Sequence, residues 1–196
     1  MPNRYGTEKE VREILLTFDD GPNPMTTPNL LDTLAKHDIK AMFFVVGERL
    51  KSSEGRSILE RAHREGHHIG NHTFTHKDLK TLAEGKIREE LRRTQDMIGV
   101  CGHECKFFRP PYGSTNATVS GILQEEGYMM VLWNVDTLDW KYKKEGAWVE
   151  HGMQQVKARE DCIVLMHDIH KTTVDHVERL IQRIKRIPNA RFVLYA

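Results

Sequence analysis

The sequence has few cysteines, no long apolar run and almost no net charge. Three cysteines in 196 residues are too few for the disulfide framework of a small secreted domain. No stretch reaches the roughly 18 consecutive apolar residues of a membrane-spanning helix, so no membrane segment is expected. Lysine and arginine total 29 against 28 aspartates and glutamates, a net charge of +1. This balance gives no reason to expect nucleic acid or an anionic membrane as a partner.

The N-terminal residues, MPNRYGTEKEVRE, are polar and lack the apolar core of a signal peptide. The sequence therefore predicts either a cytoplasmic protein or the catalytic part of a longer exported one. A chain of 196 residues suits one domain with a sizeable core. We expect a single domain spanning residues 1–196, and a monomer.

The segment CGHEC carries two of the cysteines, Cys101 and Cys105, with His103 between them. Such a pair can hold a metal or close a small disulfide loop. Zinc sites usually have a second ligand pair at a recognisable spacing, and none follows here. An ordinary polar loop is the favoured interpretation.

Strand-like and helix-like segments alternate along the chain. Apolar runs typical of strands are EILLTF, AMFFVV, HHIG, KFF, YMMVLWNV, CIVLM and RFVLYA. Helical patterns lie between them, for example residues 27–38, where Leu30, Leu31 and Leu34 share one side. Repeated strand-then-helix order predicts parallel strands joined by crossover helices. Seven or eight such units favour an α/β fold with a small closed barrel, and an open doubly wound sheet is the alternative.

Polar clusters follow the ends of five of these expected strands. DDGP follows ILLTF, NHTFTH follows HHIG, RPPYG follows KFF, DTLDW follows YMMVLWNV, and HD follows CIVLM. The carboxyl ends of parallel strands form one face of an α/β fold, and active sites lie on that face. The sequence therefore predicts that the five clusters meet in one site.

Two adjacent acids and two spaced histidines indicate a metal site. Asp19 and Asp20 repel each other, which makes one of them hard to ionise. A cation, a catalytic role or a solvated turn would each resolve this, and on its own the turn is favoured. His72 and His76, with one carboxylate, would leave metal positions open for water and substrate, as catalysis needs. A purely structural site is disfavoured because structural zinc usually has four protein ligands.

The motifs TFDDGP, HTFTH, RPPYG, DTLDW and LMHD occur in the order and approximate spacing of the polysaccharide deacetylases, the NodB-homology enzymes of carbohydrate esterase family 4. The chain resembles that family from about Ile14 to Ala196. The resemblance implies a distorted (β/α) barrel of seven or eight parallel strands. It also implies a divalent metal, with zinc the default and cobalt, manganese or nickel as alternatives. The implied partner is an acetylated oligo- or polysaccharide, such as chitin oligomers or peptidoglycan N-acetylglucosamine.

The resemblance further implies a role for each of ten residues. These are Asp20, His72 and His76 as metal ligands, Asp19 as general base, His167 as general acid, Arg109 as the residue that orients the base, Asp139 as the residue that tunes the acid, Tyr112 as backbone donor to the oxyanion, and Trp140 and Leu165 as walls of the acetyl pocket.

Three other functions are alternatives to N-deacetylation. O-deacetylation of xylan uses similar parts and stays open. A non-catalytic carbohydrate-binding barrel would need neither the paired aspartates nor His167. The absence of a G-x-S-x-G nucleophile elbow from the sequence argues against a serine hydrolase.

Overall fold

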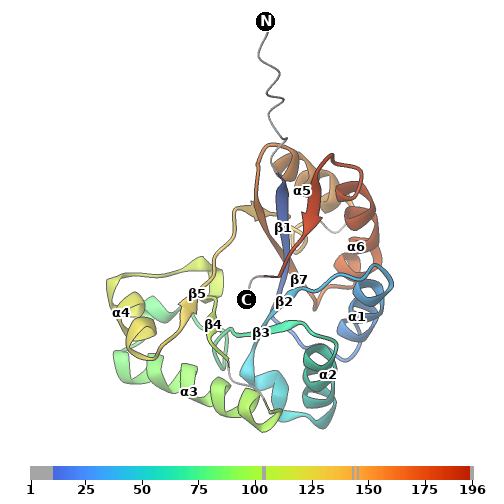
Figure 1. Cartoon of the computed structure of the whole chain (residues 1–196). Coiled ribbons are helices and arrows are strands. Elements are labelled where there is room, and N and C mark those ends of the chain that lie inside the picture. The colour runs from blue at the N-terminus through green and yellow to red at the C-terminus, as the bar shows by residue number, and fades with distance from the viewer. Residues whose placement is uncertain (1–10, 103–104, 143, 145, 195–196) are drawn as a thin grey trace, which may run out of the picture.

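One sheet of parallel strands runs through the part of the chain that the computed structural model describes, residues 11–102, 105–142, 144 and 146–194. Its strands lie in the order β5-β4-β3-β2-β1-β7-β6, and β8 pairs with the start of β1. The strands are β1 (Arg12–Asp19), β2 (Met42–Val45), β3 (His68–Asn71), β4 (Phe107–Phe108), β5 (Met129–Met130), β6 (Val135–Asp136), β7 (Cys162–His167) and β8 (Ala190–Phe192). The sheet is curled, and the helices follow one another around its outside (Figure 1).

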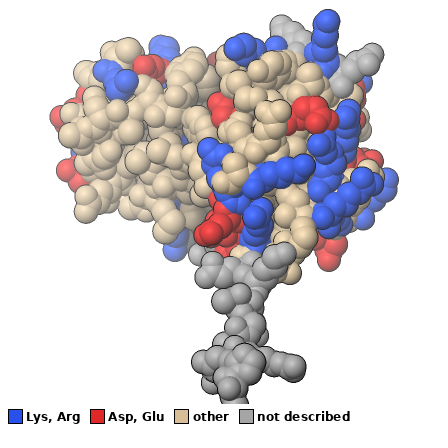
Figure 2. Space-filling model, turned by 90° about the horizontal axis from the view of Figure 1, so that it is seen from above, with Lys and Arg blue, Asp and Glu red and all other residues tan. Residues whose placement is uncertain are grey.

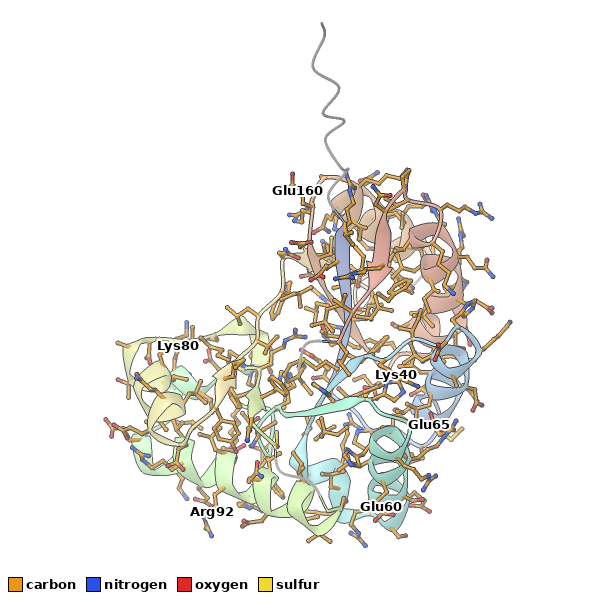
Figure 3. All side chains as sticks on the ribbon, viewed as in Figure 1. Lys40, Glu60, Glu65, Lys80, Arg92 and Glu160 are labelled. Carbon is orange, nitrogen blue, oxygen red and sulfur yellow. The ribbon has the colours of Figure 1, made fainter. Side chains whose placement is uncertain are left out.

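The α-helices each bury one stripe of apolar side chains against the sheet. They are α1 (Thr27–Lys36), α2 (Ser53–Arg64), α3 (Glu84–Val100), α4 (Ala117–Glu125), α5 (Ala147–Lys157) and α6 (Lys171–Ile184), with short 3₁₀ helices η1 (Gly47–Lys51), η2 (Leu79–Thr81) and η3 (Pro111–Gly113). In α6 the buried stripe includes Val174, Val177 and Ile181, which is the spacing of one helical face. The outer faces are charged, as Glu60 on α2 and Arg92 on α3 illustrate (Figure 3).

Strand β1 is buried on both faces, which explains its continuous apolar run. Ile14, Leu16 and Phe18 join the main core beneath the helices. Leu15 points to the other side and packs with Phe44 inside the curl of the sheet. Because side chains alternate along a strand, the same inward direction is given to residues 17 and 19. The last inward position of β1 is therefore an aspartate at the carboxyl end of the sheet.

The prediction of an α/β distorted barrel with seven or eight parallel strands is confirmed, but the barrel is not closed. In the described part of the chain, the outermost strands β5 and β6 do not pair with each other. The prediction of a single strand at YMMVLWNV is wrong. Only its two ends are strands, β5 and β6, and residues 131–134 connect these two outermost strands of the sheet. The reason is that the buried Arg109 side chain donates to the carbonyls of Val131 and Leu132 at 2.9 and 3.1 Å, in place of a neighbouring strand.

The cysteines make no disulfide in the described structure. Cys101, Cys105 and Cys162 are free thiols, and Cys105 is buried with its sulfur 3.4 Å from the Ile69 carbonyl oxygen. His103 lies outside the described residues, so the interpretation of CGHEC as an ordinary polar loop stays a prediction. The end of the expected last strand, Tyr195 and Ala196, also lies outside them.

Charge is unevenly spread over one face of the molecule although the total is nearly balanced. On the face seen from above, Lys and Arg side chains gather over the half of the molecule that carries α1 and α6, and fewer charged side chains are visible over α4 and β5 (Figure 2). Exposed apolar side chains there include Met129 and Leu132. Among the described helices, none combines the length and the apolar composition needed to cross a membrane.

Candidate active site

The five polar clusters meet at the carboxyl ends of the strands, as predicted. A cavity of about 430 Å³ opens there. Eight of the ten residues named from the sequence line it: Asp19, Asp20, His72, His76, Tyr112, Trp140, Leu165 and His167. The other two, Arg109 and Asp139, are buried behind it and contact Asp19 and His167.

The loops that carry these side chains hold strained backbone. Among the described residues, the non-glycine positions with positive φ include Asp20 (77°), Thr73 (67°), His76 (57°), Tyr112 (61°) and Leu138 (52°). Such conformations cost on the order of 1–3 kcal/mol each, persist only where the surrounding structure holds them, and cluster at active sites and ligand-binding sites. Strain is therefore concentrated around this cavity.

Asp20, His72 and His76 form a three-residue set that fits a metal ion. Their ligand atoms all lie within 4.8 Å of one another. Asp20 Oδ1 is 3.4 Å from Nε2 of His72 and 3.1 Å from Nε2 of His76. Burial alone would raise the pKa of Asp20, but the two imidazoles outweigh it and hold that pKa well below its usual range. The aspartate is thus an anion.

The tautomer of His72 makes a cation the natural occupant of this set. Its Nδ1 lies 2.6 Å from the backbone oxygen of Arg109, an acceptor only, so Nδ1 carries a proton, and in the neutral ring Nε2 presents a lone pair. Asp20 Oδ1 is buried and has no hydrogen-bond partner in the described structure. Two histidine nitrogens and one carboxylate oxygen that face each other are the donor types of a divalent transition metal with open positions.

The loop between the two histidines is fixed by a residue that sequence reasoning missed, Glu90 on α3. Its buried carboxylate accepts from the backbone N–H of Phe74 at 2.9 Å and of Thr75 at 2.7 Å, and from the Thr75 hydroxyl at 2.8 Å. The neighbouring Asn71 accepts from the Thr73 N–H at 2.9 Å. Glu90 stands among other charged residues of a helix, so no pattern in the sequence distinguished it.

Asp19, the last residue of β1, is paired with a fully buried arginine. Arg109 donates from one terminal nitrogen to Asp19 Oδ1 and to the Thr17 hydroxyl, both at 2.8 Å. Its guanidinium also lies 4.2 Å from the Phe44 ring centroid. Burial lowers the pKa of Arg109, and the charge of Asp19 opposes that shift. With Oδ1 held by Arg109, Oδ2 of Asp19 is the oxygen that faces His72, 3.6 Å from its Nε2.

His167, the last residue of β7, is paired with a fully buried aspartate. Asp139 Oδ1 lies 2.7 Å from His167 Nδ1, and Oδ2 accepts from the His167 backbone N–H at 2.7 Å and from the Thr173 hydroxyl at 2.6 Å. Burial acts to lower the pKa of His167, but the hydrogen bond and charge of Asp139 prevail and raise it to about 9. The ring is therefore protonated at neutral pH, with Nδ1 occupied by Asp139.

The turn after Asp20 packs closely over a second buried acid, Asp168. A Cβ at Gly21 would lie 2.0 Å from Asp168 Oδ2, so only glycine fits there. The same oxygen accepts from the Thr27 hydroxyl at 2.6 Å. Burial raises the pKa of Asp168 to about 7. Asp168 thus supports the Asp20 turn from beneath.

The three residues predicted to bind substrate differ in how far they are exposed. Tyr112 is 70% exposed and Trp140 49% exposed, so both present apolar surface to a ligand, whereas Leu165 is buried. Three further residues line the cavity and were not named from the sequence: Trp133, Asp136 and His170. Asp136 belongs to the DTLDW cluster, which is a signal for it in the sequence, whereas Trp133 lies within the apolar run YMMVLWNV, which is typical of a strand.

The family model, the curated relatives and the solved structures that match this chain point to the same family. Residues 6–131 match the family model described as polysaccharide deacetylase. A curated relative, the peptidoglycan-N-acetylglucosamine deacetylase PgdA of Listeria monocytogenes, is 36% identical over 178 residues, which is 90% of this chain and 37% of that protein. The chain thus spans little more than a third of that relative.

Two solved structures extend the comparison. One, described as T48 deacetylase with substrate, aligns with a TM-score of 0.85 at 36% identity and covers 93% of this chain and 88% of that one. The other, from Bacillus anthracis, is described as a pseudoenzyme of carbohydrate esterase family 4. It aligns with a TM-score of 0.84 at 28% identity and covers 93% of this chain and 64% of that one. Similar folds in this group therefore include a protein without activity, and activity must be argued from side chains.

Proposed function

The chain belongs to the polysaccharide deacetylase family, and on that premise we propose that it is a metal-dependent hydrolase that removes acetyl groups from N-acetylated glycans. One observation carries the proposal: the Asp20, His72 and His76 set faces the same cavity as an arginine-paired carboxylate, Asp19, and a protonated histidine, His167. Amide hydrolysis needs a base and an acid that keep opposite protonation states at one pH.

The ligand set supports a divalent metal as cofactor. Zinc is the default for two histidines and one carboxylate, and cobalt, manganese or nickel are the alternatives. When bound, the metal would polarise the acetyl carbonyl and make water a better nucleophile. Asp20, His72 and His76 would hold it.

Asp19 is suited to accept the proton of the attacking water. Arg109 occupies Oδ1, which leaves Oδ2 on the cavity side beside His72. A carboxylate fixed in this way needs no reorientation during the reaction, and a positioned base typically contributes about 100- to 10,000-fold in rate. Arg109 acts here by orienting Asp19, and its fully buried guanidinium has three protein oxygens besides Asp19 to hold it.

His167 is suited to protonate the leaving nitrogen. Its Nδ1 is bound to Asp139, so the proton available to the cavity is on Nε2. An amine is a poor leaving group unless it is protonated as the C–N bond breaks. The Tyr112 backbone N–H would donate to the oxyanion, and loss of such a donor typically costs about 3–4 kcal/mol of barrier. Trp140 and Leu165 would enclose the acetyl methyl group.

The proposed substrate class bears on where the protein works. Of the two localisations expected from the sequence, the catalytic part of an exported protein is the one compatible with peptidoglycan or chitin outside the cell membrane. O-deacetylation of xylan is the second candidate, because an ester needs less help from the acid His167. A carbohydrate-binding barrel without catalysis would not need the Asp139–His167 pair.

The test is acetate release from chito-oligosaccharides, peptidoglycan and acetylated xylan, measured with the purified chain as isolated, after chelation and after return of single metals. We expect release from N-acetylated glycans that is lost on chelation and restored by metal. His76→Ala should bind no metal by elemental analysis and release no acetate while its circular dichroism is unchanged. Full activity after complete removal of metal, or release from xylan alone, would contradict the proposal.

A further inference from the structure

A second cavity of about 490 Å³ adjoins the candidate active site on the His76 side. Asp20 and His76 line both cavities. The second cavity is otherwise bounded by Val46, Glu48, Arg49, Thr75 and Ile169. Because the two cavities share a wall, a polymer whose acetamide lies at Asp20 can place a neighbouring sugar or its substituent in the second one.

Two acids, Asp20 and Glu48, and one arginine, Arg49, line this second cavity, and two further cations lie near Glu48. Hydrogen bonding and charge of Lys51, followed by the charges of Arg93 and Arg49, hold the pKa of Glu48 below its usual value. Three cations therefore act on this carboxylate. Lys51 donates to Glu48 Oε1 at 2.9 Å, so Glu48 is already paired, and the other acid of the lining, Asp20, faces His72 and His76.

Arg49 differs from the other two cations in its contacts. Lys51 is bound to Glu48. Arg93 is engaged on α3, with its guanidinium 3.7 Å from the Phe74 ring centroid and one nitrogen 3.8 Å from Glu89. Among the described residues, by contrast, the Arg49 guanidinium makes neither a hydrogen bond nor an ion pair, although the residue lines the cavity. An exposed guanidinium left free beside a binding site is available to a ligand.

We propose that Arg49 binds an anionic substituent of the glycan in this second cavity and so favours acidic over neutral substrates. The guanidinium presents parallel N–H donors that match a carboxylate or a phosphate. Peptidoglycan carries carboxylates on its peptides, whereas chitin oligomers carry none. The inference rests on the proposed function and narrows its substrate class to acidic N-acetylated glycans, of which peptidoglycan is the common carboxylated one.

The experiment compares Arg49→Gln with wild type on four substrates of similar length: a peptidoglycan fragment, the same fragment with its carboxylates amidated, a neutral chito-oligosaccharide and a phosphorylated chito-oligosaccharide. Arg49→Gln should lower the ratio of kcat/KM on the carboxylated fragment to that on the neutral oligomer roughly fivefold, the usual scale for an exposed ion pair. Arg186→Gln, an exposed arginine beyond the end of α6, is the matched control and should leave the ratio unchanged. A larger loss on the phosphorylated oligomer would identify phosphate as the preferred anion.

Ionic strength gives an independent readout. Salt should raise KM for the carboxylated fragment in wild type, because an exposed ion pair is screened, and much less in Arg49→Gln. Equal changes on all four substrates, or an unchanged ratio, would overturn the role of Arg49. A wild-type protein inactive on every substrate would contradict the proposed function instead. In that case calorimetric titration of the native and amidated fragments still decides whether Arg49 binds the anion.

Discussion

Replacement of Asp139 by asparagine should move the alkaline limit of activity by more than two pH units. In the wild type, Asp139 raises the pKa of His167 from 6.5 to about 9 against the opposing effect of burial. Asparagine removes the charge of Asp139, so that burial is opposed only by the charges of Asp19 and Asp20, and the pKa should fall to about 6.5. A difference of this size corresponds to about 3 kcal/mol between the two protonation states.

The sign follows from the role of the proton. His167 acts as an acid only while it is protonated, so activity on an N-acetyl glycan should persist up to about pH 9 in wild type and fall above roughly 6.5 in the variant. At pH 7.5 only about a tenth of the variant rings would carry a proton. A cation bound at Asp20 would lower both limits, so the prediction concerns their difference.

The assay is the pH profile of kcat/KM for acetate release, with the His167 ring titrated by NMR in parallel. Asp175→Asn is the matched control, because it removes one carboxylate from the surface of α6, where that carboxylate pairs with Lys171, and leaves His167 untouched. Metal content should be equal in all three proteins. An alkaline limb that stays in place in Asp139→Asn, with an unmoved NMR titration, would refute this reasoning.

The remaining predictions concern the metal set, its supports and the fold. Asp19→Asn should keep metal by calorimetry and lose about 100- to 10,000-fold in kcat, whereas Asp20→Asn should weaken metal binding itself; the reverse assignment would contradict the proposed roles. Glu90→Gln should weaken metal binding, measured by chelator competition, by more free energy than it takes from the stability of the fold, measured by urea unfolding. Equal losses of free energy in the two measurements would indicate a merely structural role. Gly21→Ala should destabilise the protein in urea by a few kcal/mol, roughly 1–3, because its Cβ would meet Asp168; an unchanged midpoint would show that the turn can relax.

The pKa of His167 also predicts how stability depends on pH. A histidine whose folded pKa is raised contributes stability that is fully present below its unfolded value of about 6.5 and is lost as pH rises through about 9. Urea unfolding of the metal-free protein between pH 6 and 10 should therefore show a decline over that window. In Asp139→Asn the decline should be absent, and an identical decline in both proteins would count against the pairing.

Much of the fold and site follows from residues whose pattern is local. The run ILLTF, ended by Asp19 and Asp20, indicates both a buried strand and a polar site at its end, and the structure has Asp19 as the last residue of β1. His72 and His76 also meet at one carboxylate, although the residues between them form a loop and not the helical turn that a spacing of four indicates. These predictions depend on periodicity of a few residues and on the rule that strand ends share a face.

Features that depend on distant parts of the chain could not be predicted. The interruption of YMMVLWNV arises because the side chain of Arg109 takes the carbonyls that a strand would use, and no local pattern encodes that. Glu90 holds the histidine loop from a helix 16 residues away, and the sequence around it is typical of any charged helix. Such residues are identified by what they contact.

The position of β1 between β2 and β7 sets the order in which the chain can fold. β1 is made early, yet its partner β7 lies far along the chain: the Thr17 hydroxyl donates to the carbonyl of Val164, 147 positions later. At typical rates of synthesis that interval lasts roughly 7 to 30 s. During this time an apolar strand has one unpaired edge, which is a site for aggregation. The yield of active protein should therefore depend on how fast the ribosome reaches β7 and on chaperones that cover β1 until then.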